Sequence, residues 1–139
     1  MVTPSLTFLG DCKDAMALYA AAFGHEARMT RTYGDYVPEG IAQPPENLRD
    51  WILHAEMDIA ETTVLLADEV LEKHGGNGNI KLVATAPTAA EARRIFDLLS
   101  DGGRVTLPPV ETFYSVFHAG LVDRFRIRWD IIAEEAPTP

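Results

Sequence analysis

The chain has 139 residues, of which 47% are hydrophobic and 24% charged, as in ordinary globular domains. Asp and Glu outnumber Lys and Arg by 21 to 12, and the net charge of -9 argues against nucleic acid or an anionic membrane as the main partner. No apolar stretch approaches the roughly 20 residues that span a bilayer, no secretory signal pattern is visible, and the single Cys12 cannot form an internal disulfide, so we expect a cytoplasmic protein.

The spacing of apolar residues predicts eight strands, where they alternate with polar ones, and two helices, where they recur every three or four residues. The strands are expected over residues 2–9, 26–33, 51–59, 62–67, 80–85, 104–110, 115–122 and 125–133. The helices are expected within residues 11–24 and 88–103, which begin at Asp11 and at the Thr88/Glu91 capping-box pair and end in glycine. Two polar segments, 34–50 and 68–79, are expected to form long loops.

The two predicted helices align with each other. A shift of 77 positions places Ala15 on Ala92, Leu18 on Ile95, Tyr19 on Phe96 and Ala22 on Leu99. Because each helix follows one strand and precedes several others, we predict an internal repeat of two βαβββ modules, residues 1–68 and 78–133. No linker separates them, so residues 1–139 are treated as one domain.

Two helices and about eight strands predict an α+β fold in which the helices cover one side of a curved sheet. The other side must be buried by dimerisation or must curl around a cavity. Sheet edges and apolar faces that would otherwise stay exposed favour a homodimer.

The third predicted strand alternates regularly enough to assign its two faces. One face would carry Leu53, Ala55, Met57 and Ile59, and the other Ile52, His54, Glu56 and Asp58. His54 and Glu56 therefore share a face. They either point into a cavity, where the imidazole serves as base or donor and the carboxylate orients it, or belong to a half-solvated face or a dimer seam.

Six motifs occur in a recognisable order. They are Leu6-Thr7-Phe8-Leu9-Gly10-Asp11-Cys12 with Ala15, Tyr19 and Phe23-Gly24; His54-Ala55-Glu56; Leu66-Ala67-Asp68; Glu91-Ala92 with Ile95-Phe96; Gly103-Arg104-Val105-Thr106-Leu107-Pro108; and Asp123-Arg124-Phe125 with Trp129. In order and spacing they resemble the PhnB-like branch of the vicinal oxygen chelate superfamily, which includes glyoxalase I, extradiol dioxygenases and bleomycin-resistance proteins. The resemblance implies paired βαβββ modules that form an incomplete barrel around a cavity, with many members homodimeric.

Metal-dependent members of this superfamily place one ligand on each of four strands. At those positions this chain has Pro4, Leu65 or Leu66, Lys81 and Asp130, and only the last offers a carboxylate. A divalent ion needs several His, Cys or carboxylate ligands that converge on one point. We therefore expect no metal and no other cofactor, and the resemblance instead places Lys81 beside Asp130 as an ion pair.

The resemblance also marks departures in the second half. His118 stands where the family has a small residue, Tyr114-Ser115 replaces Trp-Gly, and Arg126 replaces glycine on the face expected to carry Arg128 and Asp130. The candidate ligand-binding residues are therefore His54, Glu56, Lys81, His118, Arg128 and Asp130, and Lys81 or Arg128 would hold an anionic group. The alternative is an exposed strand face with scattered charges.

Aromatic residues are a second group of candidates, as cavity or rim residues, although core packing is the better explanation for most of them. They are Phe8, Tyr33, Tyr36, Trp51, Phe113, Tyr114 and Phe117.

Three functions remain open. The first is a PhnB-like protein that binds a small organic ligand, with or without an anionic group, in its cavity and without a metal. The second is an enzyme of the same superfamily, such as an isomerase, a dioxygenase or a methyltransferase-like protein, with catalytic residues unknown. The third is a structural homodimer whose cavity has collapsed.

Overall fold

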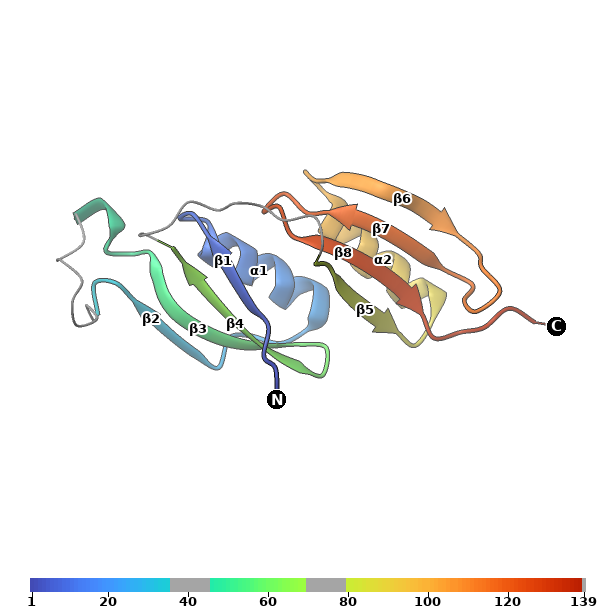
Figure 1. The fold of residues 1–139 in the computed structure, drawn as a ribbon, viewed down its shortest axis with the longest axis horizontal. Coiled ribbons are helices and arrows are strands. Elements are labelled where there is room, and N and C mark those ends of the chain that lie inside the picture. The colour runs from blue at the N-terminus through green and yellow to red at the C-terminus, as the bar shows by residue number, and fades with distance from the viewer. Residues whose placement is uncertain (36–45, 70–79, 139) are drawn as a thin grey trace. The chain divides into compact units, whose positions relative to one another are not determined.

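The computed structural model describes residues 1–35, 46–69 and 80–138. The chain divides into two compact units, Met1–Gly75 and Gly76–Pro139, which are taken in turn (Figure 1). No helix in these described ranges is long and apolar enough to cross a membrane.

The first unit is a four-stranded sheet covered on one face by a helix (Figure 1). Its elements are β1 (Ser5–Phe8), α1 (Cys12–Phe23), β2 (Met29–Thr32), a short 3₁₀ helix (Glu46–Leu48), β3 (Ile52–Ile59) and β4 (Thr62–Asp68). The strand order is β1-β4-β3-β2; β1 runs parallel to β4, and the other pairs are antiparallel.

The second unit repeats this plan. It contains β5 (Leu82–Ala86), α2 (Ala89–Ser100), β6 (Arg104–Val110), β7 (His118–Val122) and β8 (Arg128–Ala133) in the order β5-β8-β7-β6, with β5 parallel to β8. The matching order confirms the predicted α+β fold of paired βαβββ modules. The curling of the two sheets around a shared cavity stays a prediction.

The repeat is visible in the buried stripes of the helices. All eight residues of the four aligned pairs are buried, from Ala15 on Ala92 to Ala22 on Leu99, and each helix is 12 residues long. Spacings of three and four residues put these side chains on one face of each helix, and that face packs on the sheet. We call the opposite side of each sheet its helix-free face.

Strand β3 departs from the predicted alternation at its start. Arg31 of β2 lies opposite His54, but the next residue, Thr32, lies opposite Ile52, so Leu53 is an extra residue in β3. Such a β-bulge reverses the phase of the side chains. Ile52 is therefore buried with Ala55, while Leu53 is displaced from that face, and the predicted assignment of these two residues to faces is wrong.

The last strand is shorter than predicted. It begins at Arg128, and Arg126 lies in the preceding turn with a φ of 75°, so Arg126 does not belong to the strand face. A left-handed backbone favours glycine, which explains physically why glycine suits this position.

Of the two predicted side-chain caps, the structure contains the one at Thr88 but not the one at Asp11. Thr88 accepts a hydrogen bond from the Glu91 backbone N–H at 3.2 Å, as the capping-box pattern predicts. Asp11 makes no such bond to α1. The carboxylate of Asp68, at the end of β4, accepts from the Cys12 N–H at 3.1 Å instead.

Candidate functional site

The helix-free face of the second unit brings three of the predicted site residues together. Lys81 Nζ donates to Asp130 Oδ2 at 2.8 Å, so the predicted ion pair is present. His118 Nε2 lies 2.9 Å from the same carboxylate oxygen. In the strand register, Asp130 of β8 lies opposite Val83 of β5, and His118 begins the neighbouring strand β7.

Burial and hydrogen bonding oppose each other at Asp130. The side chains of Asp130 and His118 are only 13% and 14% exposed, whereas that of Lys81 is 42% exposed. Burial raises the pKa of the Asp130 carboxyl, but the hydrogen bonds from Lys81 and His118 and their charges outweigh it, and the pKa lies below its ordinary value. The carboxylate is therefore ionised at neutral pH.

A fourth residue, Tyr114, completes this cluster. Its hydroxyl hydrogen-bonds to His118 Nδ1, and the two rings meet edge to face with centroids 5.8 Å apart. An ionised carboxylate only accepts hydrogen bonds, so Nε2 of His118 carries a proton that it donates to Asp130. In the neutral imidazole, Nδ1 then accepts from the Tyr114 hydroxyl. The sequence analysis placed Tyr114 only among the rim aromatics and did not assign it to the site.

The segment that carries Tyr114 is fixed by a buried serine. Ser115 Oγ donates to the Ala133 carbonyl at 2.6 Å, and it accepts from the Phe117 N–H at 3.1 Å. The Ser115 N–H in turn donates to Thr112 Oγ1 at 3.1 Å. These bonds tie the loop to the end of β8, and they explain why serine can replace glycine at a position with no exposed surface.

Gly120 makes room for the Asp130 carboxylate. The two residues are cross-strand partners. A Cβ on Gly120 would lie 2.8 Å from Thr106 Oγ1, closer than real side chains approach, and 3.0 Å from Asp130 Oδ1, so both side chains would have to shift. Glycine is therefore favoured here by the packing of the cluster and not by its backbone conformation. Arg128 lies two residues before Asp130 on the same strand face.

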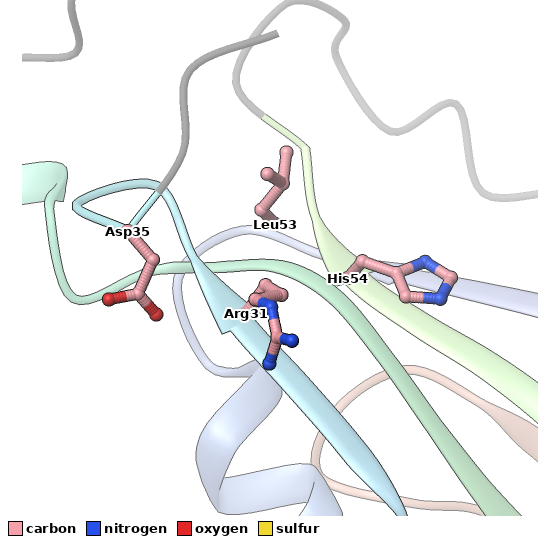
Figure 2. Close-up of a pocket in the computed structure, with 4 residues that line it drawn as sticks. All are labelled: Arg31, Asp35, Leu53 and His54. Atoms are coloured by element: carbon pink, nitrogen blue, oxygen red, sulfur yellow. The ribbon is translucent and has the colours of Figure 1, made fainter.

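His54 belongs to a pocket of the first unit. Arg31, Asp35, Leu53 and His54 line an open pocket of about 700 Å³ (Figure 2). Arg31 and His54 are cross-strand partners, and the bulge brings Leu53 into the same lining. Glu56 lies further along β3, opposite Met29 and Leu65, and is not among the described lining residues.

Charges in this pocket are only partly compensated. Arg31 NH1 donates to the Thr30 carbonyl at 3.1 Å. The Asp35 pKa is lowered by hydrogen bonds from the Thr32 backbone and side chain, and further by the charge of Arg31. A guanidinium carries five N–H donors, and among the described residues only the Thr30 carbonyl is a hydrogen-bond partner of the Arg31 side chain, which leaves donors for a bound group. Arg31 was not predicted as a site residue, because the predicted strand 26–33 also contains Arg28 and its sequence does not distinguish the two arginines.

The donors of the described residues do not fit the divalent metal that the resemblance implies. Among the residues that the structure describes, no group of three or more His, Cys, Asp or Glu converges on a point where an ion could be held. In the second unit, His118 and Asp130 are two possible metal ligands. The Lys81 ammonium, however, already binds Asp130 Oδ2, the same oxygen that contacts His118 Nε2. A divalent ion would have to displace this cation and find a third ligand.

No family model matches the sequence. The protein YjdN from Escherichia coli (strain K12) is 26% identical over 145 residues, which cover 99% of this chain and 98% of YjdN. The crystal structure of protein PA1353 from Pseudomonas aeruginosa has a TM-score of 0.82 and 25% identity, covering 96% of this chain and 97% of PA1353.

The PhnB protein from Bacillus cereus has a TM-score of 0.78 and 20% identity, covering 95% of this chain and 98% of that protein. A glyoxylase/bleomycin resistance protein/dioxygenase domain from Frankia sp. EAN1pec has a TM-score of 0.65 and 12% identity, with 97% of both chains covered. The PhnB-like, vicinal oxygen chelate fold is confirmed. That Pro4 and Lys81 stand where metal-holding relatives carry ligands stays a prediction.

The six predicted site residues thus fall into two groups of the PhnB-like fold. Lys81, His118 and Asp130 are joined by hydrogen bonds in the second unit, with Arg128 on the same face. His54 and Glu56 lie on the helix-free face of the first unit. Tyr36 lies outside the described residues, and Phe8, Tyr33 and Phe117 are buried in the core.

Proposed function

We propose that this PhnB-like chain binds a small organic ligand with an anionic group, without a metal, and acts in the cytoplasm as a homodimer. The observation that carries the proposal is the pocket that the charged Arg31, the imidazole of His54 and the apolar Leu53 line together with Asp35. An apolar wall with a few polar groups is typical of small-molecule sites. A carboxylate or phosphate matches the fork of an arginine.

The polar cluster of the second unit supports the same class of ligand. We infer that Lys81, His118, Arg128 and Asp130 form polar contacts to ligand there, and that Glu56 does so beside His54. Lys81 and Arg128 supply positive charge, while Asp130 holds Lys81 in place at 2.8 Å. Buried charge is costly unless it is paired, so a ligand anion would have to be matched by these cations.

The homodimer is supported by the exposed apolar residues of β6, which lies at the edge of its sheet. Val105, Leu107 and Val110 are all exposed. Pro108 and Pro109 have no backbone N–H to offer, and they protect this edge from strand-by-strand pairing. We therefore expect subunits to associate through side chains and not by extension of the sheet.

Titration of small carboxylates and inorganic phosphate tests the proposal, with binding followed by calorimetry in the presence of a chelator. Arg31→Met keeps the apolar stem and removes the charge, so we expect it to weaken binding about tenfold or more. Arg28→Met is the matched control, because Arg28 precedes the same strand but pairs with Asp58 outside the pocket.

Each outcome separates the alternatives. Binding that survives the chelator and is lost in Arg31→Met supports a metal-free ligand site. Binding that requires a divalent ion favours an enzyme of the superfamily such as a dioxygenase or isomerase. A dimer that binds none of these anions favours the structural role.

A further inference from the structure

We propose that Tyr114, His118 and Asp130 form a proton relay, in which the Tyr114 phenol exchanges a proton with an organic molecule bound on the helix-free face of the second unit. This activity goes beyond ligand binding. It also rests on residues other than the Arg31 pocket, so either proposal can fail without the other.

The three groups form one continuous chain of hydrogen bonds. Asp130 Oδ2 faces His118 Nε2 at 2.9 Å, and His118 Nδ1 faces the Tyr114 hydroxyl across the ring. Because the carboxylate can only accept, Nε2 donates to it, and in the neutral imidazole Nδ1 then accepts from the phenol. A histidine held by a carboxylate at one nitrogen and by a hydroxyl at the other has the geometry of a general base that activates that hydroxyl.

Exposure to solvent increases along the hydrogen-bonded series from Asp130 to Tyr114, as proton exchange with a bound molecule requires. Asp130 and His118 are largely withdrawn from solvent, whereas Tyr114 is 44% exposed. The group that would hold charge is thus shielded, and the group that would meet a ligand is accessible. Shielding strengthens the attraction between an imidazolium and the Asp130 carboxylate.

The relay balances without any further reactant. In one direction, the phenol oxygen takes a proton from a C–H or O–H group of the ligand, and the bonding electron pair remains on the ligand. At the same time the phenol proton moves to His118 Nδ1, which gives an imidazolium stabilised by Asp130. The reverse movement returns the proton to another carbon of the ligand, which gives an isomerisation, or to a leaving group whose bond breaks as the C–H electron pair forms a new π bond, which gives an elimination. In both cases the protein ends unchanged.

The neighbours of Tyr114 indicate the class of ligand. Phe113 is exposed and meets Tyr114 edge to face, with ring centroids 5.0 Å apart. On β6, Val110 lies opposite His118 and is also exposed. These residues offer an apolar, partly aromatic surface beside the phenol. The chemistry fits a flat apolar carbon acid better than a sugar or a polyphosphate.

Lys81 has a supporting role in this arrangement. Its ammonium bonds the same oxygen, Oδ2, that accepts from His118. The bond keeps the carboxylate ionised and aimed at the imidazole, and it helps to lower the Asp130 pKa against the effect of burial. Gly120 contributes by leaving the space that the carboxylate occupies.

A nitrobenzisoxazole tests the relay, because it is a flat apolar carbon acid that reports proton removal directly. When a base takes its ring C–H proton, the C–H electron pair forms the nitrile, the N–O bond breaks, and a coloured cyanonitrophenolate is released. We expect the full-length protein to accelerate this reaction above buffer at the same pH. Tyr114→Phe, which removes one oxygen from a half-exposed side chain, should lower the rate about 100-fold.

The inner residues need a readout that a structural role would not change. His118→Gly should lose the rate and recover it when free imidazole is added, because the imidazole can occupy the vacated space. Asp130→Asn should lose the rate with no recovery. His25→Gln is the control, since His25 is an exposed histidine of the first unit and should leave the rate unchanged.

The proposal is overturned if the wild-type protein does not exceed buffer, or if Tyr114→Phe retains the wild-type rate. Failure of imidazole to restore His118→Gly also contradicts the relay, provided that its circular dichroism spectrum is native. If His118→Gly does not fold, nitrogen NMR shifts of the wild-type imidazole decide instead. A neutral His118 protonated at Nδ1 contradicts the relay, and protonation at Nε2 supports it.

Discussion

Two buried aspartates each hold a set of backbone groups in place. The Asp68 carboxylate is 1% exposed and accepts from the N–H groups of Gly10 at 2.7 Å, Cys12 at 3.1 Å and Ile52 at 2.9 Å. It therefore joins the end of β1, the start of α1 and the start of β3. This explains why aspartate ends the Leu66-Ala67-Asp68 motif.

Asp123 has the same role in the second unit. It is 3% exposed and accepts from the N–H groups of Phe125 at 2.8 Å and Ile127 at 3.0 Å, and from the Trp129 indole at 3.0 Å. A buried carboxylate is tolerated where several donors replace its water. Both motifs that end or begin in aspartate are thus parts of the scaffold and not of a ligand site.

Replacing Asp68 should therefore be costly. Asp68→Ala leaves three backbone N–H groups without their acceptor, and we expect it to lower the free energy of unfolding by about 3 kcal/mol. Urea denaturation measures this change. Asp58→Ala is the matched control: Asp58 pairs with Arg28 at the surface, and its loss should cost far less than that of Asp68. Equal losses in the two variants would contradict the structural role of Asp68.

Arg126 is strained in its turn, with a φ of 75°. Arg126→Gly should stabilise the protein by about 0.5–1 kcal/mol, because glycine adopts this conformation without a steric cost. Arg126→Ala is the control, since it also removes the side chain but keeps Cβ. Thermal denaturation distinguishes them: we expect only the glycine variant to melt at a higher temperature than the wild type.

The lowered pKa of Asp130 predicts how its contribution to stability depends on pH. A carboxyl whose pKa is depressed by folding stabilises the protein above its unfolded pKa of about 3.9, and this contribution disappears as the pH falls through the lower, folded pKa. The stability difference between the wild type and Asp130→Asn should be largest at neutral pH and shrink below about pH 4. A difference that grows on acidification would contradict the ion-pair assignment.

The two helices are held at their starts by different devices. The side chain of Thr88, the residue directly before α2, caps that helix. Helix α1 is instead capped by the side chain of Asp68, which lies 56 positions after Cys12 in the sequence. Thr88→Ala should lower the free energy of unfolding by about 1 kcal/mol, as measured by urea denaturation. Asp11→Ala should cost less, because the Asp11 side chain makes no capping hydrogen bond to α1.

Most elements could be predicted because their patterns are local. The helical stripes of α1 and α2, and the eight strands, follow from periodicity alone, with ends that differ by a few residues. The bulge at Leu53 could not be predicted, because an alternating pattern looks the same until one residue is skipped. Arg126 was assigned to a strand because side-chain pattern says nothing of backbone φ.

The site was predictable only in part. Lys81 and Asp130 were paired through the resemblance, which supplies the register of two strands 49 positions apart. Tyr114 was not, because its position depends on the Ser115 and Thr112 hydrogen bonds that fix an irregular loop. The capping of α1 by Asp68 could not be predicted for the same reason, because no local sequence pattern links Asp68 to Cys12.

At the scale of the whole molecule, the net charge of -9 keeps the chains apart at long range, while exposed apolar side chains favour association at contact. We expect a homodimer in sedimentation equilibrium, strengthened by added salt. Val105→Lys, at the edge strand β6, should weaken it. Val2→Lys makes the same change at an exposed residue outside the sheets and should leave the mass unchanged.

The strand order has a consequence for synthesis on the ribosome. In each unit the last strand made lies between the first strand and the third: β4 stands between β1 and β3, and β8 between β5 and β7. The first unit has all its strands once residue 68 has emerged, but β5 waits for a neighbour until residues 128–133 are translated. A nascent chain arrested just before Arg128 would thus expose β5 with no adjacent strand of its own sheet, and unpaired strand edges of this kind are prone to aggregation.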